Sequence, residues 1–259
     1  MDPQALQIRG APRTAFVTPD FLVDDAPLRI TYYPGRSDRV VVTFNSADHN
    51  SLGNQPDEFF GIARAGAVQN HVISVSDRLK SWFSMPGMQD RIVQVVRDKI
   101  DAIGAARVMT LGSSMGGHGA LLFAERIGAD RAMSFVPQFT MSPNIKERRW
   151  TQFRPHMVEA NLHSLHRYLT GKTEAFCFFG GDCRHDRRHM KWIERRCVAT
   201  CYVLDGFTHE LPLELKARGL LDRFLMVAMT ADRAQLDALV APLLVPQDPE
   251  NAREGGTSP

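Results

Sequence analysis

One stretch of sequence decides the fold of this chain: residues Arg107 to Gly117, which read RVMTLGSSMGG. Its first half is mostly apolar, as in a short buried strand. Its second half is rich in glycine and serine, which indicates a tight turn into a helix. Gly112, Ser114 and Gly116 fit the pattern G-x-S-x-G, in which a serine lies on a strained strand-to-helix turn. The stretch therefore predicts a strand, a sharp turn that presents Ser114, and a helix.

The chain on either side of this stretch alternates between predicted strands and predicted helices. Apolar, β-branched runs predict strands, and apolar residues spaced three or four apart predict amphipathic helices. Strands are expected at 28–33, 39–44, 71–75, 132–136, 175–179 and 199–204, and helices at 90–103, 115–127, 186–196, 213–229 and 232–244, with further helices near 157–169 and ending near Ala67. This alternation predicts an α/β fold with a mostly parallel central sheet and helices on both faces.

We expect a single α/β domain over residues 25–245. Residues 1–24 carry three prolines and predict an irregular N-terminal arm. Residues 246–259 are rich in proline, glycine and charge, which predicts a disordered tail. Residues 139–173 form the longest stretch without a predicted strand, and they are the candidate for a lid or cap insertion.

The composition excludes several classes of protein. The 259 residues include 31 basic and 29 acidic side chains, and a net charge of +2 offers no electrostatic footprint for nucleic acid or an anionic membrane. No apolar run approaches the roughly 18 residues of a membrane span, and the first residues do not read as a secretory signal. We therefore expect a cytoplasmic protein without a membrane span. The oligomeric state is left open.

The four cysteines all lie between residues 177 and 201, close in sequence to His185 and His189. Reduced thiols are expected in a protein without an export signal. The spacing is irregular and lacks the C-x-x-C pair that is typical of zinc sites. The sequence therefore predicts neither a metal nor a cofactor.

Three predicted strands are followed by side chains that can carry acyl chemistry. Ser114 follows the central strand, Asp182 and Asp186 follow the strand 175–179, and His209 follows the last strand. The carboxyl ends of parallel strands lie at one edge of a sheet, where such folds place their ligand sites. The order serine, aspartate, histidine predicts a catalytic triad, with Ser114 as nucleophile and His209 as its general base.

Either Asp182 or Asp186 is expected to orient His209 and to stabilise the imidazolium that forms during the reaction. We favour Asp182, because it lies three residues past the end of its strand. Asp186 suits the N-cap of the following helix.

The negative charge on a carbonyl oxygen under attack needs two N–H donors. One is expected from Met115, the residue after the nucleophile. The other is expected from Asn45 or Ser46, in the loop after the strand 39–44. These residues form the predicted oxyanion hole.

Several nearby side chains have alternative interpretations. Ser113 is a competing nucleophile, but only Ser114 has a glycine two residues before it and two residues after it. A phosphate-binding loop is not favoured, because the stretch lacks the lysine that such a loop needs. His118 is interpreted as structural, and His49 is a weaker candidate for contact with substrate. Residues 148–150 are expected to form a solvated helix face rather than a substrate clamp. Residues 82–83, a tryptophan and a phenylalanine, either line the pocket mouth or pack in the core.

On these residues the chain resembles the α/β-hydrolase superfamily over about residues 25–230. Three segments are similar, more narrowly, to small bacterial α/β-hydrolase-like proteins of polysaccharide and surface-glycan loci: Gly112–Gly117, Asp186–His189, and His209–Leu211 with Gly219–Leu221. Those proteins usually carry an aromatic residue after the Gly-Gly of the elbow, where this chain has His118. The aspartate of the Asp-Arg-Arg-His run recurs among them, so the resemblance keeps Asp186 as an alternative acid. It implies an α/β-hydrolase fold and acyl-ester chemistry.

The expected function is that of a serine hydrolase that cleaves a carboxylic ester through an acyl-enzyme on Ser114. The expected partner is a small-molecule or glycan ester that carries an O-acyl group. One alternative is an O-acyltransferase that uses the same triad and passes the acyl group to an alcohol. Another is a non-catalytic hydrolase-like binding module, against which the intact serine, aspartate and histidine argue.

Overall fold

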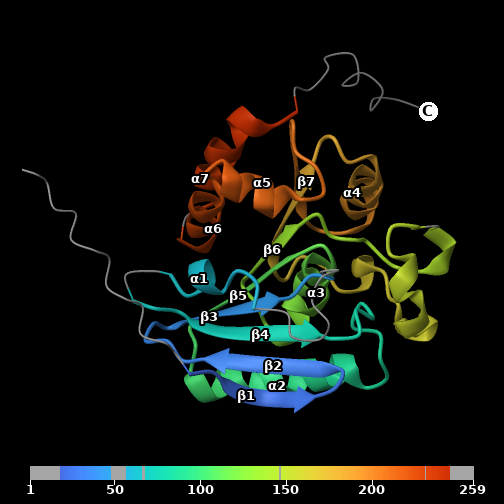
Figure 1. The fold of residues 1–259 in the computed structure, drawn as a ribbon. Helices are drawn as coiled ribbons and strands as arrows, with labels where there is room; N and C mark the ends of the chain where they lie inside the picture. The colour runs from blue at the N-terminus through green and yellow to red at the C-terminus, as the bar shows by residue number, and fades with distance from the viewer. Residues whose placement is uncertain (1–17, 48–56, 66–67, 146, 231, 246–259) are drawn as a thin grey trace, which may run out of the picture.

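The computed structural model describes residues 18–47, 57–65, 68–145, 147–230 and 232–245. Eight strands form one sheet in the order β1-β2-β4-β3-β5-β6-β7-β8 (Figure 1). The strands are β1 (Asp20–Asp25), β2 (Leu28–Tyr33), β3 (Arg39–Phe44), β4 (His71–Asp77), β5 (Arg107–Ser113), β6 (Arg131–Phe135), β7 (Glu174–Gly180) and β8 (Thr200–Leu204). Every pairing from β4 across to β8 is parallel, whereas β2 is antiparallel to both β1 and β4. The prediction of an α/β fold with a mostly parallel sheet is confirmed.

In the part of the chain that the structure describes, helices connect four pairs of successive strands, from β3 to β6 and from β7 to β8, and three more follow the last strand. They are α1 (Phe60–Ala63), α2 (Met88–Ile103), α3 (Met115–Ala124), α4 (Arg184–Arg196), α5 (Leu211–Ala217), α6 (Leu221–Thr230) and α7 (Arg233–Val240), with short 3₁₀ turns at 125–127, 143–145, 151–156, 159–161, 165–167 and 241–243. Among the described residues, no helix is both long and apolar enough to cross a bilayer.

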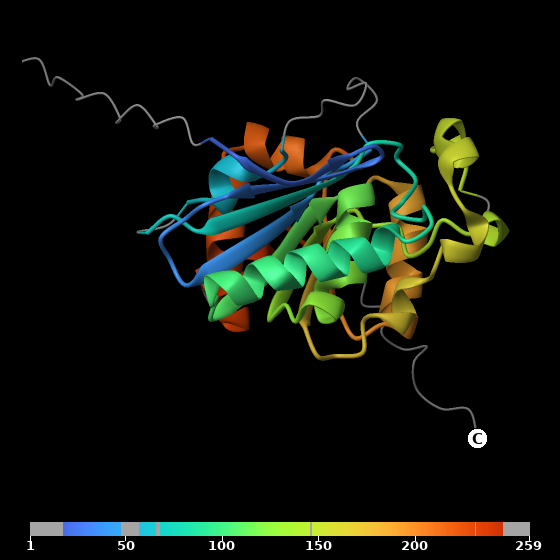
Figure 2. The same ribbon diagram turned by 90° about the horizontal axis from the view of Figure 1, so that it is seen from below.

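Successive side chains of the buried strands enter two different hydrophobic clusters, because side chains alternate along a strand. In β3, Val40 and Val42 join the cluster that contains residues of α2, α3 and α4. Val41, between them, joins the cluster that contains residues of α5, α6 and α7. Figure 2 shows α2 lying along the sheet, and Figure 1 shows α5, α6 and α7 grouped together. Burial on both sides explains why these strands are continuously apolar.

The structure corrects the N-terminal boundary of the fold. Residues 20–24 were expected to be part of an irregular arm, but they form most of β1, which pairs with β2 across a tight turn. β1 is an edge strand with four exposed residues, three of them aspartates, so its apolar run is only three residues long. Residues 1–17 and 246–259, the rest of the predicted arm and the predicted tail, lie outside the described residues.

The connection between β6 and β7 also differs from the prediction. No α-helix forms near 157–169, where the backbone makes two 3₁₀ turns instead. This part of the chain bonds to the loop after β4: the Val158 N–H donates to Ser84 Oγ, and the Asn161 side chain donates to the Ser84 carbonyl. Bonds to a neighbouring loop therefore replace the bonds of a regular helix.

The predicted helix 213–229 is two helices, α5 and α6. The break falls at Gly219, whose φ of 69° lies in the left-handed region that ends helices. α6 begins at Leu221, which lines the candidate active-site pocket described below. The break therefore places the start of α6 at the pocket.

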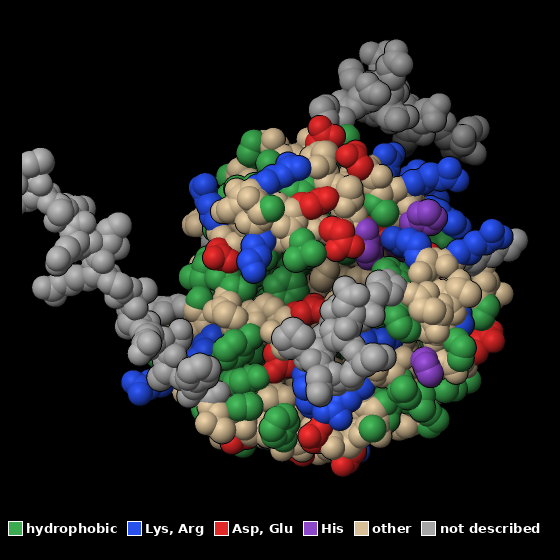
Figure 3. Space-filling model, in the orientation of Figure 1, with side chains coloured by type: hydrophobic (Ala, Val, Ile, Leu, Met, Phe, Trp, Pro, Cys, Tyr) green, Lys and Arg blue, Asp and Glu red, His purple; other side chains and the backbone are tan. Residues whose placement is uncertain are grey.

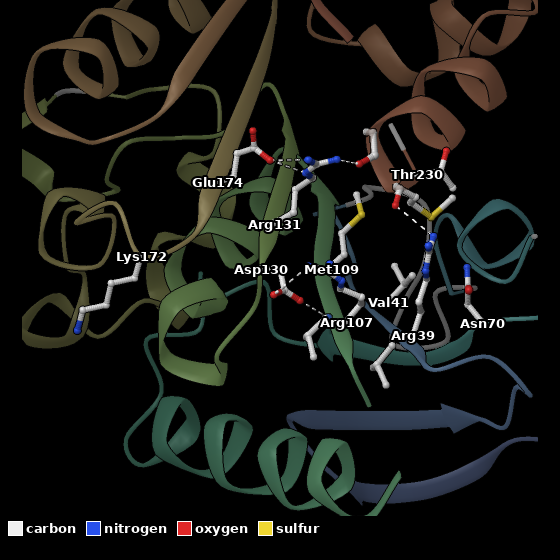
Figure 4. Close-up of a pocket in the computed structure, with 14 residues that line it drawn as sticks. Arg39, Val41, Asn70, Arg107, Met109, Asp130, Arg131, Lys172, Glu174 and Thr230 are labelled. Carbon is white, nitrogen blue, oxygen red and sulfur yellow. Dashed lines mark hydrogen bonds and ion pairs between the residues drawn. The ribbon is translucent and has the colours of Figure 1, made fainter. Parts of the chain in front are cut away.

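The far end of α6 is held by arginines that begin two strands of the sheet. Arg39 donates to the carbonyl of Met229 at 3.3 Å, and Arg131 donates to the carbonyl of Ala228 and pairs with Glu174. A cavity of about 450 Å³ lies at the amino ends of the strands. Figure 4 shows Arg39 and Arg131 among the residues that line it. Positive charge at a helix C-terminus is favourable, so these contacts anchor α6 to the sheet.

Charged side chains of both signs are interspersed on the face shown in Figure 3, in keeping with the net charge of +2.

Close backbone contacts explain the glycines of the central stretch. Ser114 has φ 52° and lies between β5 and α3, so the chain reverses sharply there. A Cβ on Gly112 would lie 2.2 Å from the carbonyl oxygen of Gly116. A Cβ on Gly116 would lie 2.0 Å from the carbonyl oxygen of Phe44, at the end of β3. Only glycine lets α3 begin this close to the sheet.

We expect Gly116→Ala to lower the free energy of unfolding by about 1–3 kcal/mol, because a backbone carbonyl cannot move aside for the new methyl group. Urea unfolding measures this change. Gly61→Ala in α1 is the matched control, since a Cβ there meets nothing within 4 Å and alanine favours a helix. Equal stability of the two variants would contradict the packing argument.

Candidate active site

His209 lies between Ser114 and Asp186 and bonds to both. Its Nε2 is 3.1 Å from Ser114 Oγ, and its Nδ1 is 2.7 Å from Asp186 Oδ2. Ser114 follows β5, Asp186 lies in the first turn of α4, and His209 follows β8. A carboxylate on Nδ1 keeps the proton there, which leaves Nε2 free to accept a proton from the serine.

The sequence favoured Asp182 as the carboxylate that contacts His209, but in the structure Asp186 makes this contact. Asp182 is exposed, and its backbone N–H donates to the carbonyl of Phe207, in the loop that carries His209. Asp186 is also not the N-cap of α4, because that position belongs to Cys183. The structure therefore places Asp186, from the first turn of α4, beside the histidine, where the sequence favoured Asp182.

Asp186 is completely buried, and its charge is stabilised by two partners. Burial raises the pKa of Asp186, but hydrogen bonding and charge from His209, together with Arg149, more than offset this effect. The pKa of Asp186 therefore lies below its ordinary value, and the carboxylate is ionised at neutral pH.

Arg149 joins this site to a second buried carboxylate. Its Nη1 donates to Asp186 at 2.7 Å and lies 3.3 Å from Nδ1 of His209, and its Nη2 donates to Glu147 at 2.8 Å. Glu147 also accepts from Nε2 of His189 at 3.2 Å. Burial raises the pKa of Glu147, but the bonds from His189 and Arg149 bring it far below its ordinary value. The connection between β6 and β7 thus supplies a buried ion network behind the histidine.

The expectation of a solvated helix face at 148–150 is wrong about the helix for all three residues and about the exposure for two of them. These residues are not helical, and Arg148 is exposed, but Arg149 is mostly buried in the network. Trp150 is buried, and its ring centroid lies 5.5 Å from that of His209. The basic and aromatic residues at 148–150 could be noticed as a run in the sequence. Their contacts could not be predicted, because Asp186 and His209 lie far from them along the chain.

The predicted oxyanion donors differ in their availability. Met115 begins α3, so its N–H belongs to the first turn, where no intrahelical partner exists. The Asn45 N–H donates to the carbonyl of Val75 at 3.0 Å, as a continuation of the sheet. The Ser46 N–H donates to a carboxylate oxygen of Glu58 at 3.0 Å. In this structure, therefore, both candidates for the second donor are already bonded.

The remaining candidates have defined positions, except His49, which lies outside the described residues. Trp82 and Phe83 pack in the hydrophobic cluster beside α2 and α3, and Trp82 also donates its indole N–H to the side chain of Gln138. His118 is also buried, and its Nδ1 lies 2.8 Å from the carbonyl oxygen of Gln138. Ser113 ends β5 and borders the pocket, but it makes no recorded contact with His209.

Three potential metal ligands meet at this site, although not those that cluster in the sequence. Ligand atoms of Cys183, Asp186 and His209 lie within 4.8 Å of one another. The guanidinium of Arg149 donates to Asp186 and lies within 3.7 Å of the Cys183 sulfur. Because a cation already occupies this position, the donor set does not suit a metal ion.

A cavity of about 1060 Å³ opens in front of Ser114 and His209. Aromatic and aliphatic side chains form much of its wall, with acidic groups and one lysine among them: Phe59, Phe60, Ile62, Trp150, Pro212, Leu213, Leu221, Asp57, Glu58, Glu210, Asp222 and Lys216. The residues come mainly from α1, α5 and the start of α6. The cavity can hold an apolar or neutral organic molecule against the serine.

We expect Arg149→Met to lower the free energy of unfolding at pH 7 by about 3 kcal/mol, because it leaves two buried carboxylates without their cation. Both carboxyl groups have folded-state pKa values below their ordinary ones, so the stability they contribute is present above about pH 4 and is lost as pH falls below it. The difference from wild type should therefore shrink at acidic pH. Urea unfolding at pH 7 and below pH 4 measures both effects.

Arg148→Met is the control for this experiment, since Arg148 is exposed and should change stability by less than about 0.5 kcal/mol. Equal destabilisation by the two substitutions would contradict the assignment of the network.

Comparison with known proteins finds similarity in structure. No protein-family model matches the chain, and no curated protein matches its sequence. The capsule O-acetyltransferase of Neisseria meningitidis serogroup A is similar with a TM-score of 0.61 and 15% identity, over 78% of this chain and 92% of that one. Thermogutta terrifontis esterase 2 is similar with a TM-score of 0.58 and 14% identity, over 93% of this chain and 100% of that one. The Pyrobaculum calidifontis esterase is similar with a TM-score of 0.56 and 12% identity, over 82% of this chain and 84% of that one. At these identities the comparisons show that the chain has an α/β-hydrolase-like fold.

Proposed function

We propose that this protein is a serine hydrolase that cleaves a carboxylic ester through an acyl-enzyme on Ser114. The observation that carries the proposal is the position of His209, with one ring nitrogen at the Ser114 hydroxyl and the other at the buried Asp186. The α/β-hydrolase-like fold and its esterase neighbours agree with it.

In this mechanism the Ser114 oxygen attacks the ester carbonyl carbon while its proton passes to Nε2 of His209. The carbonyl π pair moves onto the carbonyl oxygen, which the Met115 N–H stabilises. The intermediate collapses when the alkoxide leaves with the proton from His209, and this leaves an acyl ester on Ser114. Water, deprotonated by His209, attacks the acyl carbon and releases the acid and the serine.

The pocket favours a neutral ester over an anionic one. Glu210 and Asp222 are exposed at its wall, and Lys216 is the one lysine or arginine among the pocket-lining residues that the structure describes. Anionic groups such as phosphates would be repelled there, whereas an apolar acyl chain can pack against Phe59 and Leu213. The proposed substrate is therefore a neutral O-acyl ester of a small molecule or a glycan.

We expect a fluorophosphonate probe to label the wild-type protein and to leave Ser114→Ala unlabelled, because only an activated serine reacts with it. In-gel fluorescence and mass spectrometry of the labelled peptide measure this. Ser113→Ala is the control and should still be labelled. Labelling of Ser114→Ala at the wild-type rate would rule out this nucleophile.

We expect Asp186→Asn to lower kcat for a p-nitrophenyl ester by roughly 10³–10⁴-fold, because the histidine loses the carboxylate that sets its tautomer. Asp182→Asn is the matched control: its side chain is exposed, and it should keep at least half of the wild-type kcat. If Asp182→Asn lowered kcat more than Asp186→Asn does, Asp182 and not Asp186 would be the carboxylate of the triad.

An O-acyltransferase with the same triad is the second candidate. Trp150 packs beside His209 and borders the pocket, and an aromatic side chain at this position would reduce the approach of water to an acyl group on Ser114. One structural neighbour is itself a capsule O-acetyltransferase. This alternative predicts that a sugar alcohol added to the esterase assay diverts most of the acyl group into an acylated sugar, detected by mass spectrometry. Release of free acid alone would favour the hydrolase.

A further inference from the structure

The side chain of Gln138 lies at the Ser114 hydroxyl and has no part in the triad. Its amide nitrogen Nε2 is 3.4 Å from Ser114 Oγ, and the residue is completely buried. Catalytic hydrogen bonds are often long before substrate binds and shorten in the complex. We propose that the Gln138 amide is a catalytic hydrogen-bond donor to Ser114 Oγ. The proposal rests on the proposed function, in which this oxygen is the nucleophile.

The orientation of the Gln138 amide follows from its other neighbours. Its Oε1 lies 3.0 Å from Nε1 of Trp82, and an indole N–H only donates, so the oxygen of the amide must face the tryptophan. The NH₂ group then faces Ser114 and the carbonyl oxygen of Val136, which is 3.4 Å away and only accepts. Two independent contacts thus direct an N–H, rather than an oxygen, toward the serine.

The backbone of Gln138 is fixed as firmly as its side chain. Its carbonyl oxygen lies 2.8 Å from Nδ1 of His118, in the second turn of α3. Burial lowers the pKa of His118 to about 4, although the bond to Gln138 acts in the opposite direction. The imidazole is therefore neutral at pH 7 and carries its proton on Nδ1, where the carbonyl accepts it. α3 thus holds Gln138 beside the serine with which α3 begins.

Backbone strain at two residues brings Gln138 and Ser114 together. Val136 has φ 44°, an unfavourable conformation for a β-branched residue, and its N–H donates to the carbonyl of Phe178 at 2.7 Å. Ser114 has φ 52° at the end of the neighbouring strand β5. Such strain persists where the surroundings enforce it, and it often marks a functional site. Here it turns the chain after β6 back toward the nucleophile.

The donor has a defined task in the reaction. As the Ser114 proton passes to Nε2 of His209, negative charge grows on Oγ until its lone pair forms the bond to the ester carbon. In deacylation the same oxygen is the leaving group and regains its proton from His209. An N–H directed at Oγ stabilises the oxygen in both steps and holds the hydroxyl proton toward the histidine.

The test compares rates of fluorophosphonate labelling, which report the reactivity of Oγ directly. Gln138→Met keeps the length of the side chain and removes the donor, so we expect the rate to fall roughly ten- to hundredfold. In an ester assay kcat should fall with KM unchanged within about twofold, because the donor acts on the reacting oxygen and not on bound substrate. Thermal unfolding is measured alongside, so that every rate refers to folded protein.

Two further variants keep the test decisive if Gln138→Met does not fold. Trp82→Phe leaves Gln138 in place but removes the N–H that orients its amide, and it should slow labelling by a smaller factor. Gln138→Glu presents a carboxylate that accepts when ionised and donates when protonated. Its rate relative to wild type should therefore rise as pH falls from about 8 to about 6, because burial raises the pKa of a carboxyl group.

The two proposals fail in different ways. If the wild type does not label, or Ser114→Ala labels equally, the proposed function is wrong. If the wild type labels at Ser114 while Gln138→Met or Trp82→Phe labels at the wild-type rate, Gln138 is only a packing residue. A ratio of Gln138→Glu to wild type that does not change with pH would likewise overturn the role of the amide.

Discussion

The rest of the site depends on the buried charge of Asp186. A carboxylate with no exposure must be paired and hydrogen-bonded, because its desolvation costs several kcal/mol. Its partners come from distant parts of the chain: His209 follows β8, and Arg149 lies in the connection between β6 and β7. Satisfying this one charge therefore fixes three segments relative to one another. Arg149 extends the constraint to Glu147, which is also buried.

A second constraint is conformational and lies on the other side of Ser114. Positive φ angles at Ser114 and Val136, on the ends of neighbouring strands, direct two side chains toward the same space. The sheet maintains both conformations, since Ser114 donates its N–H to Phe135 and Val136 donates its N–H to Phe178. The fold thus holds the hydroxyl between His209 and Gln138 before any substrate arrives. Such preorganisation avoids rearrangement during the reaction.

The two ends of the sheet serve different purposes. At the amino ends, arginines that begin β3 and β6 bond to the last carbonyls of α6 and anchor that helix. At the carboxyl ends, the chain that follows β5, β7 and β8 carries Ser114, Asp186 and His209. α6 connects the two, because its first residue lines the pocket and its last turn is held at the opposite edge. The contacts that anchor α6 and the residues of the proposed active site therefore lie at opposite ends of the strands.

The sequence by itself determined the elements whose signals are local. The strand–turn–helix around Ser114 could be predicted because close backbone contacts require glycine at Gly112 and Gly116. A buried strand such as β3 could be predicted because side chains on both sides of it are apolar. The position of His209 could be predicted because it follows the strand β8. The edge strand β1 could not, because its exposed aspartates leave an apolar run of only three residues.

Only the tertiary structure decided which side chains meet. The sequence left both Asp182 and Asp186 as candidates, and which of them contacts His209 depends on the direction in which the first turn of α4 presents its residues. Arg149 and Gln138 reach the site from the connection after β6, across separations of 37 residues to Asp186 and 24 to Ser114. Pairings over such distances leave no periodic trace in the sequence, because they are selected by packing and by the cost of leaving a buried polar group unsatisfied.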